Sequence, residues 1–144
     1  MKKIVILDFD GTIADTKPVI LNTFHRTFDA MRLPQHSDEE IAATIGLPLV
    51  EACLFVNLAD LIKMVIGMDK EKAAECTAKY REIFEDVNRE IGVPMFPHVA
   101  DTVRLLHAKG CIVTIATSRG YKSAVDFVRS FGLDDVITLV VAAE

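Results

Sequence analysis

Three short apolar segments rich in β-branched residues occupy residues 3–7, 111–116 and 136–142. Each has the length and composition of a parallel strand that is covered on both faces. The second and third segments follow helical stretches that we expect to end at Gly110 and Gly132, because glycine readily adopts the left-handed conformation that closes a helix. Strands that alternate with helices in this way predict an α/β fold with a doubly wound parallel sheet.

A long stretch of helical pattern separates the first strand segment from the second. A direct crossover between neighbouring parallel strands needs only about a dozen residues or a few more. The predicted domains are therefore an α/β core formed by residues 1–15 and 94–144, and a helical-bundle cap formed by residues 16–93. We expect the cap to lie above the carboxyl ends of the core strands, where open α/β sheets bind their ligands.

Helix signals divide the predicted cap into four helices. Thr16 is expected to be the N-cap of the first helix. Ser37 and Glu40 have the spacing of a capping box and predict the start of the second helix. Apolar periodicity predicts a third helix over residues 54–65 and a fourth over residues 76–91.

The charge balance argues against a nucleic-acid partner. The chain of 144 residues carries 16 basic and 21 acidic side chains, for a net charge of -5, and its basic residues form no cluster in the sequence. Nucleic-acid binders usually concentrate Lys and Arg on one face. We therefore expect no nucleic acid among the partners of this chain.

Neither of the two most apolar segments fits a targeting or membrane-spanning role. The N-terminal run stops at Asp8, which makes it too short for a signal peptide. The apolar stretch over residues 47–66 contains Glu51, Asp60 and Lys63, and such side chains are costly at the centre of a bilayer. The three cysteines are odd in number and widely spaced, which suits a reducing compartment. A cytoplasmic protein without membrane association is predicted.

Two carboxylates follow the first strand segment, at Asp8 and Asp10, and Gly11 comes directly after them. Two acids separated by one residue point the same way on an extended chain, and glycine permits a sharp turn. Paired carboxylates at the mouth of an apolar sheet are unfavourable unless a cation compensates them, and Mg²⁺ prefers oxygen ligands. For this motif alone, acids that only cap turns at the end of a strand explain the pattern equally well.

The second strand segment leads into Thr117-Ser118-Arg119-Gly120, which we expect to form a turn before the next helix. A hydroxyl and adjacent backbone N–H groups in such a turn can bind a phosphoryl group. Thr117 could also serve only as the N-cap of the following helix. Because the carboxyl ends of parallel strands meet at one edge of a sheet, this turn should converge with Asp8 and Asp10.

The motif Asp8-Phe9-Asp10-Gly11-Thr12, the later Thr117 and the helical insertion together resemble the haloacid dehalogenase superfamily. The similarity is to the branch that contains phosphoglycolate phosphatases and β-phosphoglucomutases. It extends along essentially the whole chain and includes residues 45–49 of the cap and Phe131-Gly132-Leu133 of the core.

The resemblance implies a Mg²⁺-dependent phosphoric monoester hydrolase that acts on a small phosphorylated metabolite. Asp8 would attack phosphorus to form an aspartyl-phosphate, and Asp10 would act first as general acid and then as general base. Asp8 and Asp10 would hold Mg²⁺, Asp10 through its backbone carbonyl. The phosphate oxygens would be bound by residues of the two loops, namely Gly11, Thr12, Thr117, Ser118 and Arg119. An arginine is also common at an exposed helix start, which is the alternative interpretation of Arg119.

The sequence departs from the family pattern in two respects. The pattern continues with a lysine near a later helix and with an acidic pair after a further strand, and this chain ends without residues for either role; Lys122 lies too early. His98 occupies a position where the family often has glycine. The resemblance therefore implies that the C-terminal part of the pattern is absent, which would make residues 4–7 a sheet edge and predicts self-association through that edge.

Three hypotheses remain open at this point. The chain is a phosphatase, a phosphomutase that uses the same acids, or a non-catalytic remnant that acts as a binding or interaction module. The identity of the phosphate ester is not encoded in the motifs named above.

Overall fold

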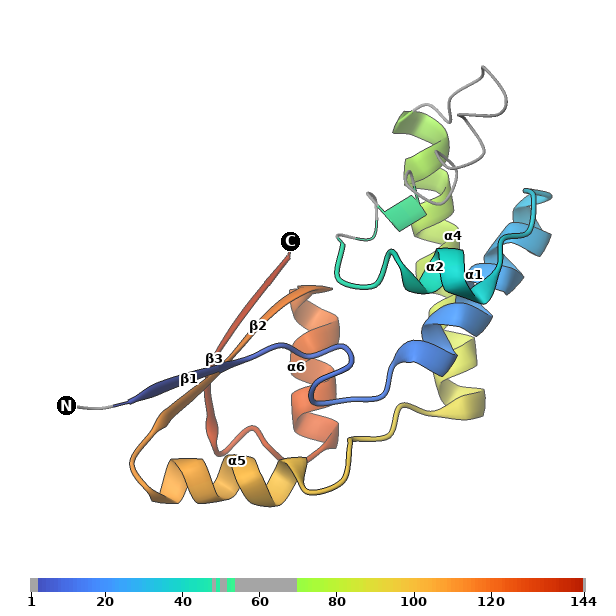
Figure 1. Cartoon of the computed structure of the whole chain (residues 1–144). Helices are drawn as coiled ribbons and strands as arrows, with labels where there is room; N and C mark the ends of the chain where they lie inside the picture. The colour runs from blue at the N-terminus through green and yellow to red at the C-terminus, as the bar shows by residue number, and fades with distance from the viewer. Residues whose placement is uncertain (1–2, 48, 50–51, 54–69, 144) are drawn as a thin grey trace. The chain divides into compact units, whose positions relative to one another are not determined.

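The computed structural model describes residues 3–47, 49, 52–53 and 70–143 (Figure 1). The helix predicted over residues 54–65 lies outside these described residues. Among the described residues, no helix is both long and apolar enough to cross a membrane. The elements follow in the order β1 (Ile4–Leu7), α1 (Lys17–Met31), α2 (Asp38–Ala42), α4 (Lys70–Ile91), α5 (Val99–Ala108), β2 (Ile112–Gly120), α6 (Tyr121–Ser130) and β3 (Ile137–Ala143).

The chain divides into two compact units. The first unit comprises Met1–Asp15 and Pro94–Glu144 and contains every strand of the described chain. The second unit, Thr16–Val93, contains α1, α2 and α4. The use of the second unit as a substrate cap stays a prediction.

The first unit is built on a parallel sheet with the strand order β1-β2-β3. Ile4 pairs with Ile112 and Leu7 with Ile115, and Val113 pairs in turn with Ile137 of β3. The three predicted strands and the α/β fold class are confirmed. Within the described part of the chain, β1 lies at an edge of this sheet.

Strand β2 is longer than predicted. It continues past Ala116 as far as Gly120, so the turn expected over residues 117–120 is wrong. After an irregularity in the pairing between Ala116 and Gly120, Gly120 pairs with Ala143 of β3. The extension therefore comes from hydrogen bonds to a distant strand, which a local sequence pattern does not report.

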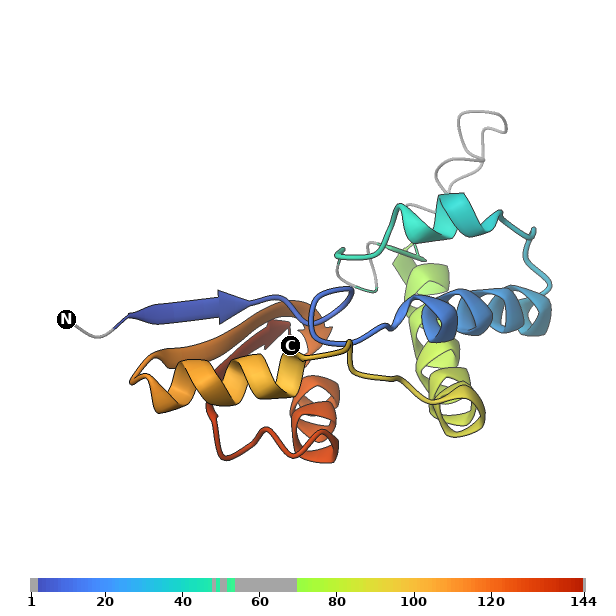
Figure 2. The same cartoon turned by 60° about the horizontal axis from the view of Figure 1, so that its bottom comes forward.

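One face of the sheet packs against α5 and α6, which Figure 2 shows on the same side of the strands. Val113 and Ile115 of β2 are fully buried. The connections from β1 to β2 and from β2 to β3 step across the sheet in the same direction. Right-handed crossovers then place both helices on the same face.

The opposite face carries apolar side chains that no described element covers. Ile4 and Ile6 of β1 are 64% and 66% exposed, and Leu139 and Val141 of β3 are 55% and 56% exposed. The register aligns Ile6 with Thr114 and Thr114 with Leu139, so these side chains share a face. A free edge and an apolar face are features that favour association, and self-association of this chain stays a prediction.

The ends of α5 and α6 follow the predicted pattern at their glycines. Gly110 and Gly132 have φ angles of 78° and 63° and adopt the left-handed conformation that closes a helix. The start of α5 is less favourable, because its N-cap His98 also lies in the left-handed region, with φ 65° and ψ 0°. A side chain with a Cβ atom is strained there.

The second unit contains an aromatic core between α1 and α4. The ring centroids of Phe24 and Tyr80 lie 4.7 Å apart, and Phe24 and Phe28 are buried. The buried hydroxyls of Thr23 and Thr27 donate to the carbonyl oxygens four residues earlier in α1. These bonds satisfy polar groups inside an apolar helix face.

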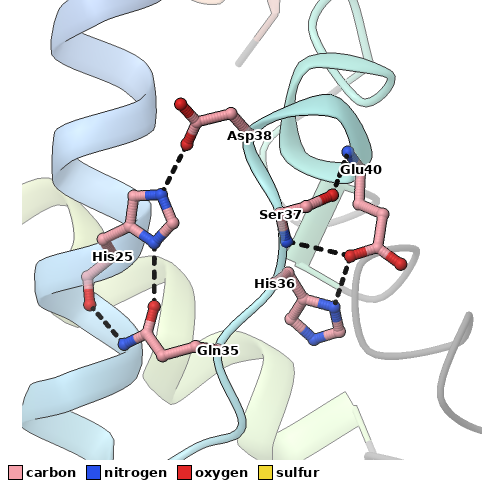
Figure 3. A network of polar contacts seen from close by, with 6 residues as sticks. All are labelled: His25, Gln35, His36, Ser37, Asp38 and Glu40. Atoms are coloured by element: carbon pink, nitrogen blue, oxygen red, sulfur yellow. Dashed lines mark hydrogen bonds and ion pairs between the residues drawn. The ribbon is translucent and has the colours of Figure 1, made fainter.

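The two predicted helix caps have different outcomes. Ser37 and Glu40 form the capping box, with the Glu40 amide donating to Ser37 Oγ over 3.2 Å and the Ser37 amide donating to Glu40 Oε2 over 2.9 Å (Figure 3). Thr16 occupies the N-cap position of α1, as predicted, but its side chain makes no capping bond. Its backbone is already in the right-handed helical region, where its hydroxyl does not meet the free amides of the first turn.

A polar network joins α1 to the segment that leads into α2 (Figure 3). The two ring nitrogens of His25 contact Gln35 Oε1 and Asp38 Oδ1, each over 2.8 Å. Because both partners are acceptor oxygens, only the protonated imidazole donates to both. The hydrogen bond to Asp38, followed by that to Gln35, raises the pKa of His25.

A short antiparallel stem in the first unit joins the segment that precedes the second unit, residues 13–15, to the segment that follows it, residues 94–96. The Asp15 amide donates to the Pro94 carbonyl over 2.9 Å, and the Phe96 amide donates to the Ile13 carbonyl over 3.0 Å. An antiparallel bridge joins Ala14 with Met95 between these bonds. The chain therefore leaves and re-enters the first unit at one place.

Candidate active site

Asp8 directly follows β1 and is exposed. Its Oδ1 atom accepts a hydrogen bond from the Phe9 amide over 2.7 Å. None of the ion pairs among the described residues includes Asp8. The carboxylate is therefore accessible to solvent and free of a cationic side-chain partner within that part of the chain.

The residue between the two acids anchors the loop after β1. Phe9 is fully buried, and its ring centroid lies 5.6 Å from that of Phe127 and 6.3 Å from that of Phe131. Burial of this ring in the aromatic cluster beneath the sheet fixes the backbone on both sides of it. Asp8 and Asp10 are therefore presented from a rigid support.

A tight turn follows Asp10, and it uses the backbone donors that were expected to bind phosphate. The Gly11 amide donates to the Ala14 carbonyl over 2.9 Å, and the Thr12 amide donates to the Phe9 carbonyl over 3.3 Å. Gly11 has a φ of 77°, which is why this turn favours glycine. The contribution of Gly11 to this site is thus its backbone conformation, and its amide does not point freely into the loop.

Thr117 and Ser118 are half-buried near the end of β2. Thr117 Oγ1 accepts a hydrogen bond from the Arg119 amide over 3.1 Å. This bond orients the Thr117 hydroxyl and leaves its proton available for an acceptor such as a phosphate oxygen. Thr117 is not the N-cap of α6, because that position belongs to Gly120.

Arg119 connects the end of β2 to the loop after β1. Its Nη2 atom donates to Asp10 Oδ1 over 2.6 Å, and its Nε atom donates to Asp10 Oδ2 over 3.3 Å. The side chains of this ion pair are only 9% and 12% exposed. The contact brings the loop after β1 and the end of β2 together, as their positions at the ends of neighbouring parallel strands predict.

This contact was not predicted from the sequence. Arg119 was expected to bind a phosphate oxygen, whereas its guanidinium faces Asp10 in the structure. The signal that could have found it is an arginine near the end of one strand and an acid just after the end of the neighbouring strand. Asp8 is brought to the same edge by the pairing of Leu7 with Ile115, although no hydrogen bond among the described residues joins it to Thr117.

The oxygen atoms of this loop suit a hard divalent cation. Asp8 offers an exposed carboxylate, and within the described chain no backbone amide donates to the Asp10 carbonyl oxygen. Mg²⁺ takes oxygen ligands and keeps several waters, so two protein oxygens are a reasonable partial set. The described residues contain no cluster of three or more His, Cys, Asp or Glu side chains that could hold a metal ion. The carboxylate oxygens of Asp10 are engaged with Arg119, which leaves its carbonyl as the ligand that the resemblance implies.

Comparisons with known proteins agree with the motif. A family model described as haloacid dehalogenase-like hydrolase matches residues 5–144. A protein of Dickeya dadantii named "Probable phosphatase IndB" is 30% identical over 145 residues, which cover 100% of this chain and 60% of that protein. A phosphoglycolate phosphatase of Vibrio vulnificus is 22% identical over 99% of this chain and 61% of its own length.

Solved structures share the fold. The crystal structure of a predicted phosphoglycolate phosphatase from Haemophilus somnus superimposes with a TM-score of 0.85 at 17% identity, over 99% of this chain and 63% of that one. CbbY from Rhodobacter sphaeroides, crystallised in complex with phosphate, gives a TM-score of 0.73 at 20% identity, over 99% of this chain and 64% of that one. The chain thus spans about three fifths of the length of the relatives it matches.

Proposed function

Because the chain belongs to the haloacid dehalogenase-like hydrolase family, we propose that it carries the nucleophile and the acid–base group of a phosphatase for small phosphorylated metabolites. The observation that supports this most is the pair of acids after β1, one exposed and one joined to Arg119 near the end of β2. Relatives named as phosphatases support the same reaction class. The activity and substrate of the whole protein are part of this proposal.

Asp8 is the proposed nucleophile. An exposed carboxylate without a cationic side-chain partner can approach phosphorus. A bond forms between an Asp8 carboxylate oxygen and phosphorus, while the bond from phosphorus to the ester oxygen breaks. Water then attacks the same phosphorus, releases inorganic phosphate and restores the Asp8 carboxylate.

Asp10 is the proposed acid–base group. The first step requires Asp10 in its protonated form, which donates its proton to the oxygen of the departing alcohol; the resulting carboxylate then removes a proton from the attacking water in the second step. The 3.3 Å contact with Arg119 leaves Oδ2 more weakly held than Oδ1, which is held at 2.6 Å. Oδ2 is therefore the atom that we assign to proton transfer.

Thr117 and Ser118 are proposed to bind the phosphoryl oxygens. The Thr117 hydroxyl is already oriented by the Arg119 amide, which lowers the cost of ordering it when a ligand binds. Asp8 and the Asp10 carbonyl are proposed to hold Mg²⁺, whose charge would offset the repulsion between the Asp8 carboxylate and the phosphate oxygens.

Release of inorganic phosphate from a panel of phosphate esters tests this proposal. We expect turnover with Mg²⁺ that is lost with EDTA, and a loss on the order of a thousandfold or more in Asp8→Asn, because the amide is not a nucleophile. Asp134→Asn is the matched control, since Asp134 is an exposed acid of the same unit and should leave turnover unchanged. Equal turnover in wild type and Asp8→Asn would refute the proposal. Interconversion of phosphate isomers without phosphate release would indicate a mutase instead.

A further inference from the structure

Arg119 lies near the end of β2 and makes contacts with Asp10 in the loop after β1 and with Thr117 in its own strand. We propose that Arg119 is a positioning residue that holds Asp10 for proton transfer, and that it acts through Asp10 and not by binding the substrate phosphate. This inference rests on the proposed function, because the role of Asp10 does so.

The two hydrogen bonds from Arg119 to the Asp10 carboxylate differ in length. Nη2 of Arg119 holds Oδ1 at 2.6 Å, while Nε lies 3.3 Å from Oδ2. A carboxylate that is held tightly at one oxygen cannot rotate freely about its bond to Cβ. Arg119 therefore fixes the direction of Oδ2 without occupying it as strongly, which suits an oxygen that exchanges a proton.

The guanidinium is itself held in place. Its central carbon lies 5.2 Å from the ring centroid of Phe9 and 5.1 Å from that of Phe127, and Nη1 donates to Ser123 Oγ over 2.9 Å. Stacking and hydrogen bonding together define both the plane and the rotation of the group. A guanidinium fixed in this way determines where the Asp10 carboxylate lies.

The backbone of the same residue orients Thr117. The Arg119 amide donates to Thr117 Oγ1 over 3.1 Å, while the side chain binds Asp10. A single residue thus sets the proposed acid–base group and the proposed phosphate-binding hydroxyl. Substitution of the side chain should disturb Asp10 and leave the backbone contact with Thr117 in place.

A role in phosphate binding fits these contacts less well. The side chain of Arg119 is 9% exposed and its Nε, Nη1 and Nη2 atoms all donate to protein oxygens. To bind a phosphate it would have to leave a nearly buried carboxylate without its partner, which is costly. The contacts favour a fixed internal role.

Kinetics of Arg119→Met and Arg119→Lys separate the two roles, measured with the phosphate ester that the wild type turns over best. We expect kcat to fall about ten- to a hundredfold in Arg119→Met, with KM changed by less than about threefold, because orientation is lost and substrate contacts remain. Arg119→Lys should recover little of the lost kcat, since lysine keeps the charge but cannot form the bidentate hydrogen bonds or stack on the aromatic rings as a guanidinium does. Arg104→Met is the matched control: this exposed arginine of the same unit also pairs with a carboxylate, that of Asp135, and its loss should leave kcat unchanged.

The double variant Asp10→Asn with Arg119→Met provides the decisive readout. If Arg119 acts through Asp10, removing its side chain has no further effect on kcat once Asp10 is changed, so the two losses are strongly non-additive. Additive losses, an increase in KM without a loss of kcat, or full recovery by Arg119→Lys would overturn the inference and leave the proposed function standing. If the wild type has no turnover with any ester, the proposed function is refuted and this inference with it. Urea unfolding curves are recorded for every variant, and kinetic constants are compared only among variants that are fully folded under the assay conditions. Lost activity is then not confused with lost folding.

Discussion

Replacement of His98 by glycine should stabilise the protein. His98 is the N-cap of α5, lies in the left-handed region with φ 65° and ψ 0°, and makes no side-chain capping bond. A residue with a Cβ atom loses about 1–2 kcal/mol in this region relative to the right-handed one. Glycine avoids most of that strain, but its greater freedom in the unfolded chain costs about 0.5–1 kcal/mol. The expected net gain is about 0.5–1 kcal/mol.

Urea unfolding followed by far-UV circular dichroism measures this gain. The midpoint should rise without a change in slope, and a gain of this size corresponds to an increase in Tm of about 1–4 °C for a chain of this length. His98→Ala is the matched control, because it removes the imidazole and keeps the Cβ atom. If His98→Ala stabilises the protein as much as His98→Gly does, or if His98→Gly brings no gain, the strain argument is refuted.

Two further predictions concern the second unit and the sheet face. The pKa of His25 is raised by its bonds to Asp38 and Gln35, so its stabilising effect is complete below the ordinary histidine pKa of about 6.5 and is lost as the pH rises through the folded-state value (Figure 3). In urea unfolding, wild type should thus lose stability relative to His25→Gln as the pH rises above about 6.5, and an unchanged difference would contradict this. Ile6→Lys places a charge on the exposed face of β1, so any concentration-dependent self-association seen by light scattering should weaken. Thr138→Lys, on an exposed position of β3, is its control, and equal weakening by both would argue against the β1 edge.

The parts of the fold that follow local rules could be predicted from the sequence. The β-branched runs identified the strands, and the closing glycines at Gly110 and Gly132 identified two helix ends. The capping box at Ser37 and Glu40 formed because both of its partners lie within one helical turn. In each case the deciding interactions connect residues that are close in the sequence.

The errors concern features that distant contacts decide. The extension of β2 depends on its pairing with β3, and the direction of the Arg119 side chain depends on an acid 109 residues away. At the candidate site, the sequence therefore named candidate residues, whereas the pairing of Asp10 with Arg119 had to come from the structure.

The stem between Ile13 and Phe96 makes the helical insertion separable in principle. Because the Asp15 amide already bonds to the Pro94 carbonyl, a tight hairpin could replace everything between these two residues without stretching the chain. A gene with residues 16–93 excised should then yield a miniature of the sheet unit, and other helical modules could be grafted at the same two positions. In evolutionary terms, the junction would allow the insert to be exchanged while the carboxylates of the loop after β1 keep their support.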